Sequence, residues 1–322
     1  MITYIVKRIL SAIPIMFGLV TLVFFITRLM PGDPATLFIS PKMPPRVAMQ
    51  LRAEFGLDQP VTVQYGRWLA GVAQGNFGFS FTHQRAVTEV VGRAFLNTAL
   101  LAGSAIVIEL VLGVLIGMLA VRFRHSVLEK FISYGGLVVY TMPVFWVATL
   151  LLLFFSGMLG ILPSSQMHSV GADQLNSFGY SIDFLKHLIL PSLTLALPGA
   201  AGLARYVQSQ LTLTLKEPYI LTAKSFGFSD RRILLTHALP NALLPIITIV
   251  GLELGGLLSG ALVTETLFAW PGIGRITVMA IFARDYPLIL GCTVITGIVV
   301  ILGNLTADIL YTAVDPRVNI TS

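Results

Sequence analysis

Charged residues are scarce in this sequence. Only 11% of its 322 residues are Asp, Glu, Lys or Arg, whereas 55% are hydrophobic and the mean hydropathy is +0.84. A soluble globular protein of this length would need far more polar side chains to cover its surface. The composition therefore excludes a soluble globular protein and predicts an integral membrane protein.

Cysteine and the common catalytic motifs are also nearly absent. Cys292 is the only cysteine, which excludes an intrachain disulfide and a thiolate metal site. The histidines are scattered, and neither a HExxH metal motif nor a GxSxG nucleophile motif is present. A phosphate-binding GxxxxGKS or GxxxxGKT loop is missing as well. We therefore predict that this chain is not an enzyme and carries no catalytic residue, metal site or cofactor.

Apolar runs dominate what remains. Six segments are long enough to span a hydrocarbon core of about 30 Å, which takes roughly 20 helical residues. They are Ile9–Met30, Asn97–Val121, Phe131–Leu159, His187–Gln208, Asn241–Phe268 and Tyr286–Tyr311. A backbone in lipid must satisfy its own hydrogen bonds, so we expect helices, kinked or ended by Pro143, Pro191, Pro198 and Pro245. The sequence predicts an all-α polytopic membrane protein with six transmembrane helices.

The basic residues indicate how the helices are oriented. The net charge is +6, but Lys and Arg flank apolar runs and do not cluster among aromatic side chains, so no nucleic-acid partner is expected. One side would hold Lys7, Arg8, Arg122, Arg124, Lys130, Lys216, Lys224, Arg231, Arg232 and Arg317, and the other only Lys186, Arg275 and Arg284. The richer side is predicted to be cytoplasmic, with both termini inside. Residues 31–96 would then be extracytoplasmic, with short interfacial helices near Pro44–Phe55 and Val63–Val72.

Carboxylates within the apolar segments are the candidates for a translocation path. Glu109, Glu253 and Asp308 qualify, and Glu253 is the strongest because glycines surround it. The alternative is that each is paired inside the helix bundle. Arg205 and Glu265 are expected near the membrane surface, where their side chains would reach water. Glycines four residues apart, Gly113 with Gly117, Gly251 with Gly255 and Gly256 with Gly260, predict close helix packing or, for the fifth helix, a contact with a partner.

A charged stretch, residues 216–240, separates the fourth and fifth apolar segments. Its charges are too costly to bury in lipid, so it must lie in water. Pro218 fits the first turn of a helix, Gly227 would end that helix, and Ser229 would cap a second one beginning at Asp230. Tyr219, Ala223 and Phe226 would share one face of the first helix, with Lys216, Thr222 and Lys224 more exposed. Such a helix is suited to docking in a groove of a soluble protein, and the alternative is a plain connecting loop.

These residues carry a resemblance. Thr222-Ala223, then Gly227, then Leu239-Pro240 resembles the EAA signature of binding-protein-dependent ABC importer permeases, although Leu221 stands at the usual Glu and His237 at the usual Ile. Five further stretches are similar to the dipeptide, oligopeptide and nickel branch: MPGDPA at 30–35, FGLDQP at 55–60, FAWPGIGR at 268–275, ARDYP at 283–287 and DPR at 315–317. They lie in the expected order from one end of the chain to the other.

The resemblance implies a single permease domain, residues 1–322, in the bacterial inner membrane, with an extracytoplasmic insertion at 31–96 and a cytoplasmic coupling loop at 209–240. It implies a second permease subunit, two ATPase subunits that bind ATP and Mg, and an extracytoplasmic binding protein that delivers peptides. The residues expected to couple to the ATPases are Glu217, Tyr219, Thr222, Ala223, Lys224, Gly227, Leu239 and Pro240.

Alternatives remain open at this stage. The same architecture could import nickel, another metal chelate or another small solute. A self-contained proton-coupled carrier would use Glu109, Glu253 or Asp308, and a non-transporting membrane scaffold is a third reading.

Overall fold

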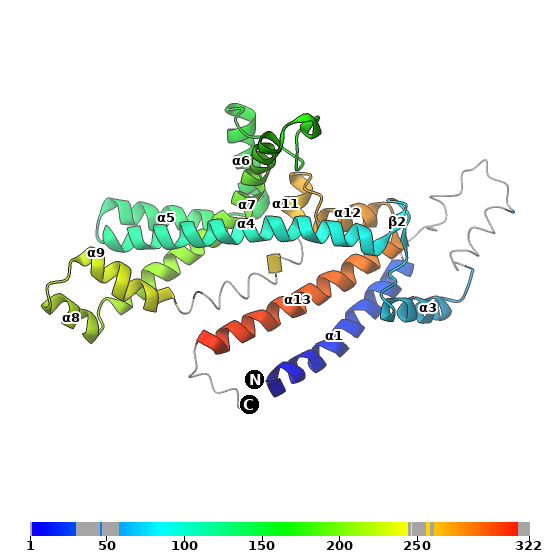
Figure 1. Ribbon diagram of the computed structural model, residues 1–322, viewed down its shortest axis with the longest axis horizontal. Helices are drawn as coiled ribbons and strands as arrows, with labels where there is room; N and C mark the ends of the chain where they lie inside the picture. Colours follow the sequence, from blue (N-terminus) through cyan, green and yellow to red (C-terminus); the bar gives the residue numbers. More distant parts are fainter. Residues whose placement is uncertain are drawn as a thin grey trace.

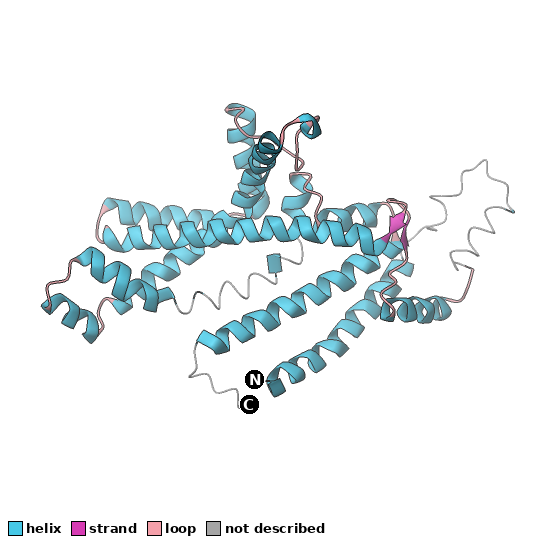
Figure 2. Ribbon diagram, in the orientation of Figure 1, coloured by secondary structure: helices cyan, strands magenta, loops and turns pink. Residues whose placement is uncertain are grey.

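A computed structural model describes residues 2–29, 46, 58–243, 246, 256–257 and 261–314. Helices make up most of this part of the chain, and its strands are two short pieces of a hairpin (Figure 2). Four helices are long and apolar enough to cross a membrane: α1 (Ile2–Leu29), α4 (Val87–Arg122), α7 (Ser177–Thr214) and α13 (Tyr286–Val314). The all-α, polytopic prediction is confirmed at this level.

The third apolar segment is bent rather than straight. It forms α5 (Val127–Thr141) and α6 (Val144–Leu151), which continues as the π-helix η2 (Leu152–Met158), with a bend of 109° between the two halves. Figure 1 shows α6 pointing away from α5 and α4. Met142 is extended and Pro143 precedes the first turn of α6, as expected where a proline excludes the preceding residue from helical backbone. Pro143 therefore interrupts the segment as predicted, but Phe131–Leu159 is not one continuous helix.

Two other parts of the prediction have different outcomes. Pro191 and Pro198 lie inside α7 and end no helix. Half of the fifth segment, Asn241–Phe268, lies outside the described residues, as do Pro245 and nearly all of the predicted helix at Pro44–Phe55. The total of six spans is therefore not tested by this structure.

The second interfacial helix is present as α3 (Val61–Ala73). It packs against α1, where the Phe24 ring lies 5.2 Å from the ring of Tyr65 and 5.5 Å from that of Trp68. A hydrogen bond of 2.7 Å joins Thr21 Oγ1 to the Tyr65 hydroxyl. α1 in turn lies beside α13, with the N-terminus and the end of α13 at the same end of the molecule (Figure 1).

The central contact is a long seam between α4 and α7. A Cβ on Gly113 would lie 2.8 Å from the Leu203 Cβ, and one on Gly117 would lie 2.7 Å from the Val207 Cβ. The two backbones approach this closely only because both positions lack a side chain. Gly113 and Gly117 thus pack helices within the chain, whereas Gly251, Gly255 and Gly260 lie outside the described residues.

Short elements join the long helices at the two ends. At one end, β1 (Phe79–Ser80) pairs antiparallel with β2 (Arg85–Ala86), and α11 (Leu262–Leu267) and α12 (Ile273–Phe282) precede α13. A 3-10 turn, η3 (Ala172–Gln174), leads into α7. At the other end lie α8 (Pro218–Ser225), α9 (Asp230–Arg232) and the π-helix η4 (Ile233–Ala238). Figure 1 shows α8 and α9 together beyond the end of α4.

Candidate functional site

The charged stretch folds as its turn residues predict. Pro218 occupies the first turn of α8, and Gly227 adopts a left-handed conformation with φ of +78° two residues after the helix ends. Such a backbone angle strains any residue with a Cβ, so glycine ends the helix here. Ser229 then caps α9 by accepting a hydrogen bond from the Arg232 backbone N–H at 3.4 Å. The predicted order of helix, glycine turn and second helix is confirmed. Residues 209–214 of the predicted coupling loop belong to α7, so the name coupling loop is used below for residues 215–240.

One face of α8 is buried in the protein itself. Ile220 and Ala223 are 0% and 7% exposed. They join an apolar cluster built from α7, η4 and the residues just after η4: Leu203, Val207, Leu211, Ile233, Ala238, Ala242 and Ile246. Leu239 is half-buried against the same cluster. Ala223 therefore anchors α8 to the bundle, and its small side chain lets the helix lie close to its neighbours.

Other apolar side chains on α8 and just after it are exposed. Tyr219, Leu221 and Phe226 are 42%, 59% and 74% exposed. Glu217, Thr222, Lys224, Gly227 and Pro240 are exposed as well. Tyr219, Ala223 and Phe226 were expected on one face, and of these three only Ala223 is buried. The bundle takes the side of α8 that carries Ile220, which the turn signals alone do not reveal.

Side-chain contacts join α8 to η4 and to the residues that follow it. The Asn241 side-chain N–H donates to the Tyr219 hydroxyl at 3.0 Å and to the His237 carbonyl at 2.9 Å. Phe228 is stacked between two partners: its ring is 5.6 Å from the parallel His237 ring and 4.3 Å from the Arg232 guanidinium. His237 thus has a packing role here. These contacts join α8 and the turn after it to η4 and to Asn241.

A second ordered site lies at the opposite end, around Glu265. This carboxylate is 0% exposed and accepts hydrogen bonds from the Thr98 hydroxyl at 2.7 Å and the Arg275 backbone N–H at 3.1 Å. Thr98 also accepts from the Ile273 backbone N–H at 2.9 Å. The two side chains therefore satisfy amides in the first turn of α12, where a negative charge is favoured. The expectation that Glu265 reaches water is wrong, because these donors hold its carboxylate inside.

Neighbouring residues leave room for this carboxylate. A Cβ on Gly272 would collide with the Glu265 carboxylate. Trp270 is fully buried, and its indole N–H donates to the Asn97 carbonyl at 2.9 Å. The FAWPGIGR stretch thus builds a tight turn between α11 and α12 and attaches it to α4.

Asp285 performs a similar role next to α13. Its fully buried carboxylate accepts from the Ser80 hydroxyl at 2.7 Å and from the Thr82 hydroxyl and backbone N–H at 2.8 and 2.9 Å. It also accepts from the Leu288 backbone N–H at 3.3 Å. Asp285 therefore joins the hairpin region to the first turn of α13. The sequence does contain a signal for this role: Asp285 directly precedes a helix that has Pro287 in its first turn.

Of the three predicted path carboxylates, the structure describes the side chain of Glu109 alone. Glu109 is buried on α4 against α7, and a Cβ on Gly199 would lie 2.5 Å from its carboxylate oxygens. Glu253 and the side chain of Asp308 lie outside the described residues. Among the described residues, no group of three or more His, Cys, Asp or Glu side chains is placed to hold a metal ion.

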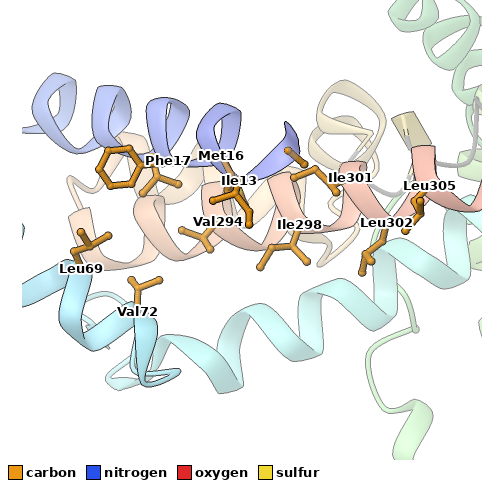
Figure 3. A pocket seen from close by; sticks show the side chains of 12 residues that line it. Ile13, Met16, Phe17, Leu69, Val72, Val294, Ile298, Ile301, Leu302 and Leu305 are labelled. Carbon is orange, nitrogen blue, oxygen red and sulfur yellow. The ribbon is translucent and has the colours of Figure 1, made fainter. Parts of the chain in front are cut away.

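An apolar groove lies between α1, α3 and α13. All twelve side chains that line it are apolar, among them Phe17, Leu69, Val294 and Leu305 (Figure 3). Its volume is about 410 Å³. It offers no polar group that would orient a bound solute, so we do not assign it to cargo.

The fold has a counterpart among solved structures. The chain resembles a chain in an inward-facing structure of the MetNI methionine ABC transporter, with a TM-score of 0.52, covering 71% of this chain and 97% of that one. The sequences are only 16% identical, so this likeness concerns the fold alone.

Sequence comparison gives much closer relatives. The chain is 38% identical to the oligopeptide transport system permease protein AppB of Bacillus subtilis, over 99% of both chains. It is 35% identical to the glutathione transport system permease protein GsiC of Escherichia coli K12, again over 99% of both. Residues 86–320 match the family described as binding-protein-dependent transport system inner membrane component, and residues 1–103 match the N-terminal family of such membrane components. With its several apolar helices, the chain is a multi-pass inner-membrane protein and belongs to the family of binding-protein-dependent transport system inner membrane components.

Proposed function

We propose that this protein is a permease subunit of an ABC importer for di- or oligopeptides, and that it forms half of the translocation path. A second permease of the same family would supply the other half. Two ATPase subunits would bind ATP and Mg and dock on the coupling loop, and an extracytoplasmic binding protein would deliver the peptide. This arrangement places both termini and the coupling loop in the cytoplasm.

The observation that carries this proposal is the two-sided α8. Ile220 and Ala223 fix the helix to the bundle, whereas Tyr219, Leu221 and Phe226 present an apolar surface to the outside. Exposed apolar side chains in a charged segment outside the lipid are typical of a protein contact. Closure of the ATPase pair would move this surface, and the Phe228 stack would transmit the movement to η4.

The docking role is tested in the reconstituted transporter, with the second permease, both ATPase subunits and the binding protein present. Gly227→Val places a β-branched residue at φ of +78° and should distort the loop, which lowers substrate-stimulated ATPase activity at least tenfold. Gly171→Val is the matched control, because Gly171 has φ of +85° and open space around it in a distant turn. Normal stimulation and subunit assembly in the Gly227→Val transporter would contradict docking at this loop.

The cargo is tested in the same reconstituted system. We expect accumulation of labelled di- or oligopeptides that depends on ATP and on the binding protein. Glutathione and a nickel chelate are the comparison substrates. Uptake of either one without peptide uptake would leave the permease assignment intact and replace the proposed cargo.

A further inference from the structure

A second hollow, about 510 Å³ in volume, lies between α4, α5 and α7. Small residues create it, notably Gly135, Gly136, Ala200 and Ala201. A Cβ on Gly135 would meet no atom within 4 Å, and one on Gly136 would meet only the Ala201 Cβ, at 4.0 Å. Leu128 and Phe131 on its rim are 44% and 75% exposed. The hollow is therefore an open apolar space, accessible from outside the helices.

Unlike the groove of Figure 3, this hollow contains a cation. Arg205 on α7 lines it and is exposed. Within the part of the chain that the structure describes, its guanidinium has neither a hydrogen bond nor an ion pair. Arg205 lies nine residues before the end of α7 at Thr214, about 14 Å along the helix axis. An exposed arginine side chain at this depth can reach toward the membrane surface, where an anionic headgroup can meet it.

The nearby acidic residue is already engaged. The Glu129 carboxylate accepts from the Gln208 side-chain N–H at 2.9 Å through one oxygen and from the His125 backbone N–H through the other. Arg122 at the end of α4, Arg124 in the turn that follows and Lys130 near the start of α5 are exposed at the same end of these helices. Arg205 thus lines the hollow, three further cations lie at the same end of these helices, and the carboxylate of Glu129 is occupied. The charge of the site complements an anion.

We propose that this hollow binds an anionic phospholipid from the leaflet at the coupling-loop end of the protein. The phosphate contacts Arg205 and an acyl chain fills the space beside Gly135, Gly136 and Ala201. The surrounding bilayer supplies such a ligand at high concentration, and basic pockets between membrane helices suit anionic headgroups. The bound lipid would hold α5 in place against α7. α7 leads directly into the coupling loop and so into α8.

The test uses the complete transporter in nanodiscs of phosphatidylglycerol and phosphatidylethanolamine. Retained lipids are identified by native mass spectrometry after delipidation. We expect selective retention of phosphatidylglycerol, about fivefold weaker in Arg205→Gln, which corresponds to one cation near the membrane surface. Arg205→Lys should keep most of the retention. Arg93→Gln is the matched control, because Arg93 is an exposed arginine at the other end of α4 and should change nothing.

The acyl-chain part of the proposal has its own variant. Gly136→Leu fills the hollow without removing a charge, and it should abolish retention as fully as Arg205→Gln does. Unchanged retention in both Arg205→Gln and Gly136→Leu would overturn the site. Displacement of the lipid by glycerol phosphate, which has the anion but no acyl chain, would also overturn it. If Arg205→Gln does not assemble, Arg205→Lys and Gly136→Leu still decide the question.

Discussion

Single residues in this protein often act through the backbone groups they satisfy. Glu265 was expected at the membrane surface because an isolated carboxylate in an apolar segment is costly to bury. That reasoning omits the donors that the fold brings from a distance: Thr98 on α4 and the Arg275 amide at the start of α12. Nothing in the local sequence places Thr98 next to Glu265. The position of Glu265 was therefore beyond prediction from the sequence, although its residue type is well suited to a helix N-terminus.

The first prediction concerns this carboxylate. Glu265→Ala leaves the Thr98 hydroxyl and the Arg275 amide without their acceptor in a buried site, so we expect a loss of about 3 kcal/mol in stability. The rise in labelling of buried Cys292 with temperature, followed by mass spectrometry of the purified transporter, measures the change. Glu89→Ala is the control, because Glu89 is an exposed partner of Arg85 and Arg93 and should cost about 0.5 kcal/mol or less. Equal effects of the two substitutions would contradict the helix-capping role of Glu265.

At the scale of elements, the sequence predicts helix ends better than helix surroundings. Pro218 and Gly227 bound α8 correctly because their backbone restrictions are local. The side of α8 that faces the bundle depends on where Leu211 and Ile233 lie, which is a property of the tertiary packing. For the same reason, Pro143 indicated an interruption, while the bend of 109° follows only from the packed structure.

The second prediction separates the two sides of α8. Ala223→Leu overpacks a buried position and should destabilise the protein by about 1–3 kcal/mol. Phe226→Ala should leave stability within about 0.5 kcal/mol, because this side chain is largely exposed, yet lower substrate-stimulated ATPase activity by removing a docking contact. Thermal unfolding and ATPase assays on both variants measure these effects. Phe178→Ala removes an equally exposed ring at the start of α7 and should change neither quantity. If Phe226→Ala behaved like Phe178→Ala, the exposed face would not be the docking surface.

The third prediction concerns the seam between α4 and α7. A methyl group on Gly117 would lie 2.7 Å from the Val207 Cβ and 2.8 Å from the Ala204 carbonyl oxygen, so Gly117→Ala must separate the helices. We expect a loss of about 1–3 kcal/mol, detected by thermal unfolding. Gly103→Ala, on the same helix but with nothing within 4 Å, should instead stabilise α4 by up to about 1 kcal/mol. If Gly117→Ala left the thermal stability unchanged, the close packing of α4 against α7 would not contribute to stability.

At the scale of the whole molecule, transport can be driven either by partner subunits or by carboxylates on this chain. The family relationship favours ATP hydrolysis on separate subunits. Glu109 remains the described carboxylate that a proton-coupled carrier would use, but it is buried where α4 meets α7 and rests on Gly199. A carboxylate held between two closely packed helices has little space for the exposure to both sides that proton coupling requires.

The fourth prediction decides between these energy sources. In proteoliposomes with all partner subunits and ATP, peptide uptake should stay within about twofold when a protonophore collapses the proton gradient, because hydrolysis supplies the driving force. Glu109→Gln, which keeps the size of the side chain against Gly199, should likewise support uptake. Omitting the ATPase subunits should abolish accumulation even with an imposed proton gradient. Uptake by this chain alone under such a gradient, lost in Glu109→Gln, would instead make Glu109 the coupling group and the protein a carrier.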